Sequence, residues 1–413
     1  MSILKGSFLL IGGAIFAQLL TILFSPFLVK LYGASGLGYL GNFISIASIV
    51  GIVSTLRTER KIVSAGNQED VRLYFQSTVL IAILMSILSF FILNLLISVN
   101  TIKLTPSTSV LVVSFAFFYG LYQATKVLAS RDGKFHPITY SVIIRSVAVI
   151  FFQVMFYFIF ASAIGIVLGA FMGIFVATSY LAFKTIAKTD MKNWPSQATI
   201  MLRTKDYLKD AFWGGGQALF SALSNNIPLI LITTLGGFVD AGLFFLAERF
   251  VRLPINLISN NLRNVIISKI SANERHYHRF IIKISMGLFA LALICSVIAY
   301  LFSDYFYLTF FGAELLQSSD ITKLMLIWVI FNFLSLPFQT YNANFMNMKN
   351  LTFIEAIFLV IKVSCIYSAY YLNYGVVAAA GAIAFCSSLY SLMQIVIYFL
   401  NHRNRRCDVI KTI

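Results

Sequence analysis

The sequence predicts an all-α polytopic membrane protein of about twelve transmembrane helices. Of its 413 residues, 59% are hydrophobic and only 11% are charged. Apolar windows of about 20 residues, the length that crosses a bilayer as a helix, recur along the whole chain. The second half begins with the same residue pattern as the first. This repetition predicts two six-helix lobes related by a pseudo-twofold axis along the membrane normal.

The apolar windows place the expected helices in order. In the first half they cover roughly residues 7–29, 37–56, 78–99, 108–129, 138–160 and 162–183. In the second half they cover roughly residues 211–234, 238–260, 280–302, 321–345, 353–372 and 375–400. The expected domains are an N-terminal lobe (1–183), a cytoplasmic linker (184–210), a C-terminal lobe (211–400) and a basic cytoplasmic tail (401–413).

The internal repeat rests on a shift of 204 residues. This shift places Gly33 on Gly237 and Gly38 on Gly242, in the turn between the first two helices of each half. The same shift also matches Lys5 with Lys209, Phe8 with Phe212, Gly12 with Gly216 and Leu31 with Leu235. Pro26 should bend the first helix near its outer end. Because six is an even number, both halves have the same orientation in the membrane.

The basic residues indicate the topology. The net charge is +16, and nearly all Lys and Arg fall in alternate connections if the N-terminus is cytoplasmic. Only Lys30, Lys103 and Lys323 fall on the outer side. The positive-inside rule therefore predicts that both termini are cytoplasmic. The charge is then a signal for topology and lipid headgroups, and we expect no nucleic acid as partner. The four cysteines show no paired spacing, so neither a disulfide framework nor a metal or other cofactor is expected.

The first candidate site is the expected helix 238–260, which carries three charges in an apolar run. Charges at bilayer depth are costly and persist mainly where they face a cavity, a partner or a substrate. Glu248 and Arg252 are four residues apart and should pair on one face. Arg249 is rotated away from that face and has no acidic residue at helical spacing. Arg249 is therefore the leading candidate, with snorkelling to the membrane surface as the alternative.

Further candidates lie in other expected helices. Arg145 and Lys362 are cations inside spans, and Glu355 could pair with Lys362. Lys126 shares a face with Tyr119 and Tyr122, but it lies near a helix end and we interpret it as snorkelling. Polar residues at helical spacing indicate faces turned to a cavity; the candidates among them are Gln18, Gln217, Asn225, Asn332 and Gln339.

The turn and helix-end residues resemble a known family. The segments that carry the resemblance are Pro26 with Leu31-Tyr32-Gly33-Ala34 and Leu37-Gly38, then Leu56-Arg57-Thr58-Glu59, and then Arg249-Phe250-Val251-Arg252-Leu253-Pro254. They are similar to the polysaccharide-biosynthesis (O-antigen) flippases of the multidrug/oligosaccharidyl-lipid/polysaccharide superfamily, which have a MATE-like fold. Thr58 departs from the pattern, because an aromatic residue is expected there.

The resemblance implies a protein of the bacterial inner membrane. It would move undecaprenyl-diphosphate-linked oligosaccharide repeat units from the cytoplasmic to the periplasmic leaflet, by alternating access through a cationic central cavity. Arg57 and Glu59 would act at the inner end of the second helix. A polysaccharide polymerase, a chain-length regulator and a coupling ion, H⁺ or Na⁺, would be partners. The excess of buried cations agrees with an anionic diphosphate substrate.

Two other functions compete with this interpretation. A multidrug antiporter of the same superfamily should bind cationic drugs and use buried carboxylates for coupling, but the first helix contains none. An enzyme, such as a polysaccharide polymerase or ligase, would need catalytic groups on a sizeable outer loop. All four histidines fall on the inner side, and the sequence contains no phosphate-binding loop or nucleophile motif. We therefore expect a transporter and not an enzyme.

Overall fold

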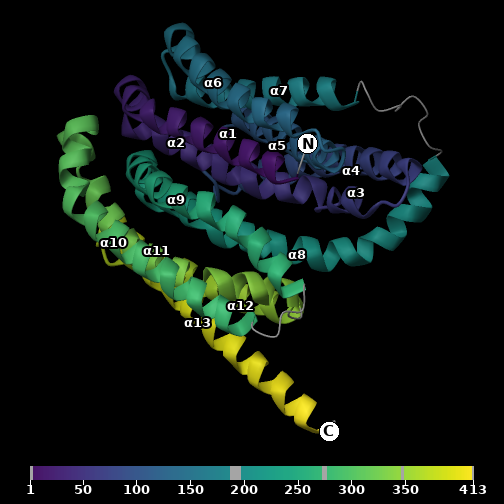
Figure 1. The fold of residues 1–413 in the computed structure, drawn as a ribbon. Coiled ribbons are helices and arrows are strands. Elements are labelled where there is room, and N and C mark those ends of the chain that lie inside the picture. The colour runs from purple at the N-terminus through teal and green to yellow at the C-terminus, as the bar shows by residue number, and fades with distance from the viewer. Residues whose placement is uncertain (1–2, 187–196, 272–276, 346–347, 412–413) are drawn as a thin grey trace. The chain divides into compact units, whose positions relative to one another are not determined.

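The structure is a computed structural model that describes residues 3–186, 197–271, 277–345 and 348–411. Throughout these residues the regular elements are helices, as Figure 1 shows. Within them, 10 helices are long and apolar enough to cross a membrane. The chain divides into two compact units, Met1–Gly242 and Leu243–Ile413. The predicted all-α polytopic class is confirmed.

Among the described residues, the first unit contains eight helices and the start of a ninth. They are α1 (Ile3–Leu23), α2 (Ser25–Thr55), α3 (Arg60–Ser64), α4 (Gln68–Ser98), α5 (Pro106–Arg131), α6 (Phe135–Phe160), α7 (Ala163–Ile186), α8 (Gln197–Gly236) and the first residues of α9 (Phe238–Ser271). α8 begins inside the segment predicted as a linker, and the part of that segment from residue 187 to 196 lies outside the described residues. The predicted lobe boundaries remain a prediction.

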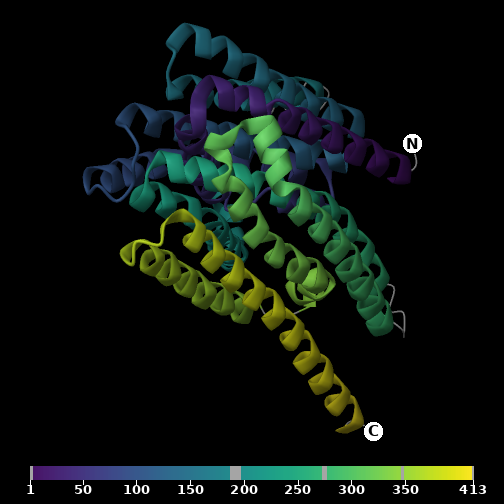
Figure 2. The ribbon, with the colours of Figure 1, turned by 90° about the vertical axis from the view of Figure 1, so that its left-hand side faces the viewer.

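The second unit, over its described residues, contains the remainder of α9, four further α-helices and one short 3₁₀ helix. They are α10 (Tyr277–Phe311), the short 3₁₀ helix η1 (Ala313–Leu315), α11 (Gln317–Phe345), α12 (Met348–Tyr371) and α13 (Gly375–Lys411). Each predicted span lies in an observed helix to within a residue at its ends, except that the span 7–29 is divided between α1 and α2. The segment predicted as a tail after residue 400 instead continues α13 as a helix, which Figure 2 shows at the yellow end of the chain.

The first predicted span is interrupted where Pro26 predicted a bend. α1 ends at Leu23 and α2 begins at Ser25, with Pro26 in its first turn. The hydroxyl of Ser25 donates to the carbonyl of Thr21 at 2.8 Å, so one backbone acceptor near the break has a side-chain donor. α2 then contains a second interruption at Gly33, which separates the end of the first predicted span from the second.

The two glycine turns predicted by the repeat have the same unusual backbone. Gly33 has φ 68° and Gly237 has φ 92°, both in the region that favours glycine. The later glycines, Gly38 and Gly242, each contact the other turn within the first unit. A Cβ on Gly38 would lie only 2.8 Å from the carbonyl carbon of Phe238, and a Cβ on Gly242 only 2.7 Å from that of Ala34. The shift of 204 residues exchanges these two contacts, as a two-fold axis would.

The short helix α3 packs against α4 and α5 in the first unit. The mixed charges of residues 57–72 predict a solvated loop with a short surface helix. In the structure Ile62 of α3 is fully buried against Val71, Phe75, Ala124 and Leu128 of α4 and α5. The short helix is therefore part of the core of the unit, because its one large buried apolar side chain is covered on all sides.

α11 and α13 pack along each other in the second unit. Asn342 of α11 donates to both the backbone carbonyl and the side-chain oxygen of Gln394 on α13, at 2.8 and 2.9 Å.

The Sγ atoms of Cys365 and Cys386 lie 3.8 Å apart on α12 and α13, and both thiols are free. Cysteine spacing in the sequence gives no sign of this contact, because it depends on how the two helices pair.

Candidate functional site

The predicted pair on α9 forms. Arg252 Nη2 lies 2.7 Å from Glu248 Oε1, one helical turn away. The Arg252 guanidinium also lies over the ring of Trp328 on α11, 5.8 Å from its centroid. The side chain of Arg252 is 32% exposed and that of Glu248 is 13% exposed. Arg252 is thus held by an ion pair and an aromatic face, while part of its side chain remains accessible.

Two further charged residues belong to this group in the second unit. Lys362 and Glu355 of α12 are both buried, and Lys362 interacts electrostatically with Glu355 and with the Glu248–Arg252 pair. The hydroxyl of Tyr390 on α13 lies 3.3 Å from Glu355 Oε1 and donates to it. Arg252 and Lys362 are therefore matched by two carboxylates. We call Glu248, Arg252, Glu355 and Lys362 the balanced cluster, because their formal charges cancel.

Arg249 occupies a different face of α9 from this pair. It is half-buried and takes part in interactions of its own. Consecutive residues of a helix point about 100° apart, so Arg249 is not a member of the ion pair. Its role as the leading substrate contact remains a prediction.

A second group of cations lies in the first unit, between α5 and α6. The guanidinium of Arg145 is 5.7 Å from the centroid of the Tyr119 ring. Lys126 and Tyr122 both interact electrostatically with Arg145, and the Tyr122 hydroxyl is 3.0 Å from the Ser141 hydroxyl. We call Arg145, Lys126, Tyr119 and Tyr122 the cationic cluster.

The cationic cluster differs from the balanced cluster in its acidic residues. In the part of the chain that the structure describes, no carboxylate forms an ion pair with Arg145 or Lys126. Two like charges that approach each other inside a membrane protein destabilise each other unless an anion lies close by. The region between α5 and α6 therefore carries two positive charges that act on each other.

Lys126 was not among the predicted site residues. Its spacing from Tyr119 and Tyr122 places all three on one face of α5, and this signal was visible in the sequence. What the sequence could not show is that Arg145 of α6 lies against that face. Without that contact, a lysine near the end of a helix is expected to snorkel.

Polar residues of α11 hydrogen-bond to one another along the helix, and their predicted orientation towards a cavity stays a prediction. Ser335 donates to the backbone carbonyl of Asn332 at 3.1 Å, and Gln339 donates to the Ser335 hydroxyl at 2.7 Å. The side-chain oxygens of Asn332 on α11 and Gln18 on α1 are buried without a hydrogen-bond partner among the described residues. Buried acceptors of this kind are costly unless a ligand or water supplies a donor.

The two predicted polar residues of α8 differ in what the structure describes. Asn225 is exposed and donates to the Ser221 carbonyl at 2.8 Å. The side chain of Gln217 lies outside the described residues.

The residues expected to act at the inner end of the second helix lie in a tight turn. α2 ends at Thr55, and both Leu56 (φ 47°) and Arg57 (φ 57°) have left-handed backbones before Glu59 and α3 follow. Thr58 is buried, and its hydroxyl is 2.7 Å from the Thr55 carbonyl and 3.1 Å from the Thr78 hydroxyl of α4. A small hydroxyl side chain fits this position where an aromatic residue was expected.

With this geometry in place, comparison with known proteins identifies the family. A family model described as polysaccharide biosynthesis protein matches residues 3–267. The chain belongs to the polysaccharide biosynthesis protein family. The predicted membership is confirmed. No curated protein matches the chain in sequence.

Several solved structures of transporters and flippases are similar to this chain in fold. The lipid II flippase MurJ in an inward closed conformation is 17% identical, with a TM-score of 0.71 over 94% of this chain and 88% of MurJ. An inward-facing multidrug resistance MATE family transporter of the MOP superfamily is 14% identical, with a TM-score of 0.69 over 98% of this chain and 95% of the transporter. A mutant of the Vibrio cholerae MATE transporter VcmN is 15% identical, with a TM-score of 0.65 over 97% of this chain and 96% of the transporter. These likenesses establish a MATE-like fold.

Proposed function

We propose that this protein is a flippase for undecaprenyl-diphosphate-linked oligosaccharide units, such as O-antigen units. It moves them from the cytoplasmic to the periplasmic leaflet of a bacterial inner membrane. Membership of the polysaccharide biosynthesis protein family supports this substrate class. The fold that the chain shares with a lipid II flippase supports the reaction. A flippase breaks no covalent bond, so the residues need only bind, release and shield the polar headgroup.

The cationic cluster is the observation that carries this proposal. Arg145 lies about 15 Å along α6 from Phe135, and Lys126 lies about 7.5 Å from the end of α5 at Arg131. A diphosphate brings negative charge to this depth and accepts hydrogen bonds from a guanidinium, an ammonium and two phenol groups. It would relieve the repulsion between the two cations, while the cations offset the cost of taking the diphosphate out of water.

The balanced cluster has a different role in transport. Since its charges cancel, it offers less net attraction to a diphosphate than the cationic cluster does. Its Arg252 side chain, together with Arg249 and the polar face of α11, would contact the sugar and diphosphate during transport. The inside-negative potential favours outward movement of an anion by about 2.3 kcal/mol per charge per 100 mV, which would assist alternating access.

Variants of the cationic cluster test the proposal in cells. The accessibility of lipid-linked repeat units in each leaflet is measured for Arg145→Ala and Lys126→Ala, with Arg145→Lys as the charge-conserving variant. Lys134→Ala is the matched control, because Lys134 is also a cation near the α5–α6 turn but is already paired with Asp132 at 2.9 Å. We expect units to accumulate in the inner leaflet with the alanine variants only. Normal outward movement in both alanine variants, at normal protein levels, would refute the role of the cluster.

A multidrug antiporter is the second candidate. The MATE structures share the fold, and the buried carboxylate of Glu355 is the kind of group that ion coupling uses. This function predicts that cells lacking the protein become more sensitive to cationic drugs, and that Glu355→Gln reproduces the sensitivity. The flippase proposal predicts unchanged drug sensitivity and altered surface polysaccharide.

A further inference from the structure

A groove on the second unit lies between α10, α11 and the start of α13. It has a volume of about 590 Å³, and its lining includes Tyr300, Asp320, Lys323, Ile327 and Ile330. A second cavity of about 230 Å³, between α9, α10 and α11, is lined almost entirely by apolar side chains. Ser296 and Leu326 line both spaces, so the two are neighbours. The groove has a polar end at Asp320 and Lys323, and the neighbouring cavity is apolar.

The polar and apolar residues of the groove are separated along the axis of α11. Asp320 and Lys323 lie in the first two turns of α11, and Ile330 lies about 15 Å further along the helix from Asp320. The separation matches an amphiphile whose headgroup lies at the start of α11 and whose hydrocarbon chain runs along Ile327 towards Ile330. On the predicted topology, the polar end lies in the outer leaflet.

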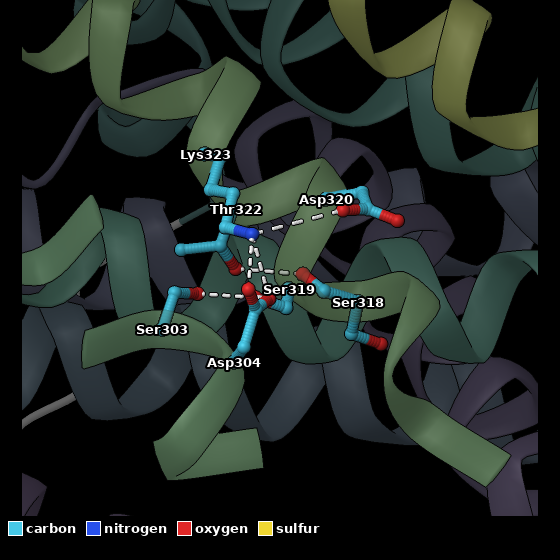
Figure 3. A network of polar contacts seen from close by, with 7 residues as sticks. All are labelled: Ser303, Asp304, Ser318, Ser319, Asp320, Thr322 and Lys323. Atoms are coloured by element: carbon cyan, nitrogen blue, oxygen red, sulfur yellow. Dashed lines mark hydrogen bonds and ion pairs between the residues drawn. The ribbon is translucent and has the colours of Figure 1, made fainter. Parts of the chain in front are cut away.

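The polar end carries one cation and two carboxylates. Lys323 Nζ lies 2.6 and 2.7 Å from the two oxygens of Asp304, and the Ser319 hydroxyl is 2.7 Å from Asp304 Oδ1. Figure 3 shows Asp320 on another side of the same ammonium, at the longer distance of 3.9 Å. Asp304 therefore has two close polar partners, whereas Asp320 has one longer contact. Both carboxylate side chains are more than half exposed, Asp304 at 56% and Asp320 at 58%.

This charge arrangement selects among lipid headgroups. The excess of one carboxylate repels a headgroup that is only anionic. A carboxylate beside an apolar groove is stabilised by a cation that donates hydrogen bonds. Lys323, which is 19% exposed, offers positive charge to a phosphate next to that cation. A zwitterionic headgroup with a primary ammonium satisfies both requirements.

We propose that this groove is a binding site for phosphatidylethanolamine from the surrounding bilayer. The lipid ammonium donates to Asp320, the phosphate lies beside Lys323, whose ammonium lies over the Tyr300 ring, and an acyl chain runs along Ile327 towards Ile330. The bound lipid joins α10, α11 and α13 at their outer ends. The site is distinct from the cationic and balanced clusters, and it does not depend on what the protein transports.

Thermal unfolding of the purified full-length protein in detergent tests the site. The protein is titrated with phosphatidylethanolamine, with phosphatidylcholine, whose trimethylammonium has no N–H donor, and with phosphatidylglycerol. We expect phosphatidylethanolamine to stabilise the wild type at about tenfold lower concentration than either other lipid. Asp320→Asn should remove this preference and should fold normally, because the side chain is exposed. Glu314→Gln, which removes another exposed outer carboxylate that does not line the groove, should keep the preference.

Two results would overturn the proposal. One is equal stabilisation of the wild type by phosphatidylethanolamine and phosphatidylcholine. The other is an Asp320→Asn protein that retains the full preference. As a test of the acyl path, Ile327→Trp fills the groove without changing its charge. It should weaken stabilisation by all three lipids, and unchanged binding in this variant would also contradict the site.

Discussion

Gly38→Ala should separate α2 from the junction of α8 and α9. The added Cβ would lie 2.8 Å from the Phe238 carbonyl carbon and closer still to its oxygen, whereas ordinary contacts begin at 3.4 Å. The backbone must therefore retreat by at least about 0.6 Å, the difference between 3.4 and 2.8 Å, because a carbonyl cannot turn away as a flexible side chain can. We expect the free energy of unfolding to fall by about 1–3 kcal/mol, the usual range for overpacking. It is measured as a lower unfolding temperature of the purified protein.

The reciprocal contact makes this prediction sharper. Gly242→Ala should have a similar effect, since its Cβ would lie 2.7 Å from the Ala34 carbonyl carbon. The double variant should lose clearly less unfolding free energy than the two single variants together. A displacement that accommodates one Cβ also makes room for the other. Gly12→Ala is the control, with nothing within 4 Å of its added Cβ. If Gly38→Ala unfolds at the same temperature as Gly12→Ala, or if the two losses simply add, the reciprocal packing is not as described.

Two further predictions concern single polar contacts. Glu248→Gln should leave Arg252 without its ion-pair partner and lower stability by about 1–2 kcal/mol, a value reduced for the partial exposure of both side chains. Arg252→Gln combined with Glu248→Gln should recover part of this loss, and no recovery would argue against the pair. In thermal unfolding, Thr58→Val should lower the free energy of unfolding by about 1–2 kcal/mol, because the buried Thr58 hydroxyl loses its hydrogen bonds to the Thr55 carbonyl and the Thr78 hydroxyl. A valine variant as stable as wild type would show that these hydrogen bonds contribute nothing.

Hydropathy and local spacing were enough to predict where the long helices lie, apart from the break between α1 and α2, and where the glycine turns fall. Both signals act over short distances in the chain: a span needs consecutive apolar residues, and a backbone with positive φ favours glycine, which has no Cβ. The Glu248–Arg252 pair was predictable for the same reason, since residues four apart share a helix face. The match of Gly33 with Gly237 needed no structure either, because the repeat preserves the residue that the backbone requires.

Contacts between helices could not be predicted in this way. Arg145 lies over Tyr119, and Arg252 lies over Trp328, only because of the rotation and pairing of whole helices. Hydrophobic periodicity does not specify that rotation in helices that are apolar on most faces. The spacing in the sequence suggested the Glu248–Arg252 and Glu355–Lys362 pairs, because each pair lies on one helix. It could not show that the two pairs lie near each other.

Movement of a lipid-linked diphosphate between leaflets tests the central claim most directly. The purified protein is placed in vesicles that carry a fluorescent undecaprenyl-diphosphate-linked oligosaccharide, and the rate at which the label becomes accessible on the opposite side is recorded. We predict that wild type and Lys134→Ala move the lipid at the same rate, and that the Arg145→Ala and Lys126→Ala double variant is at least about tenfold slower. A wild-type rate no faster than that of empty vesicles, or an unimpaired double variant, would contradict the claim.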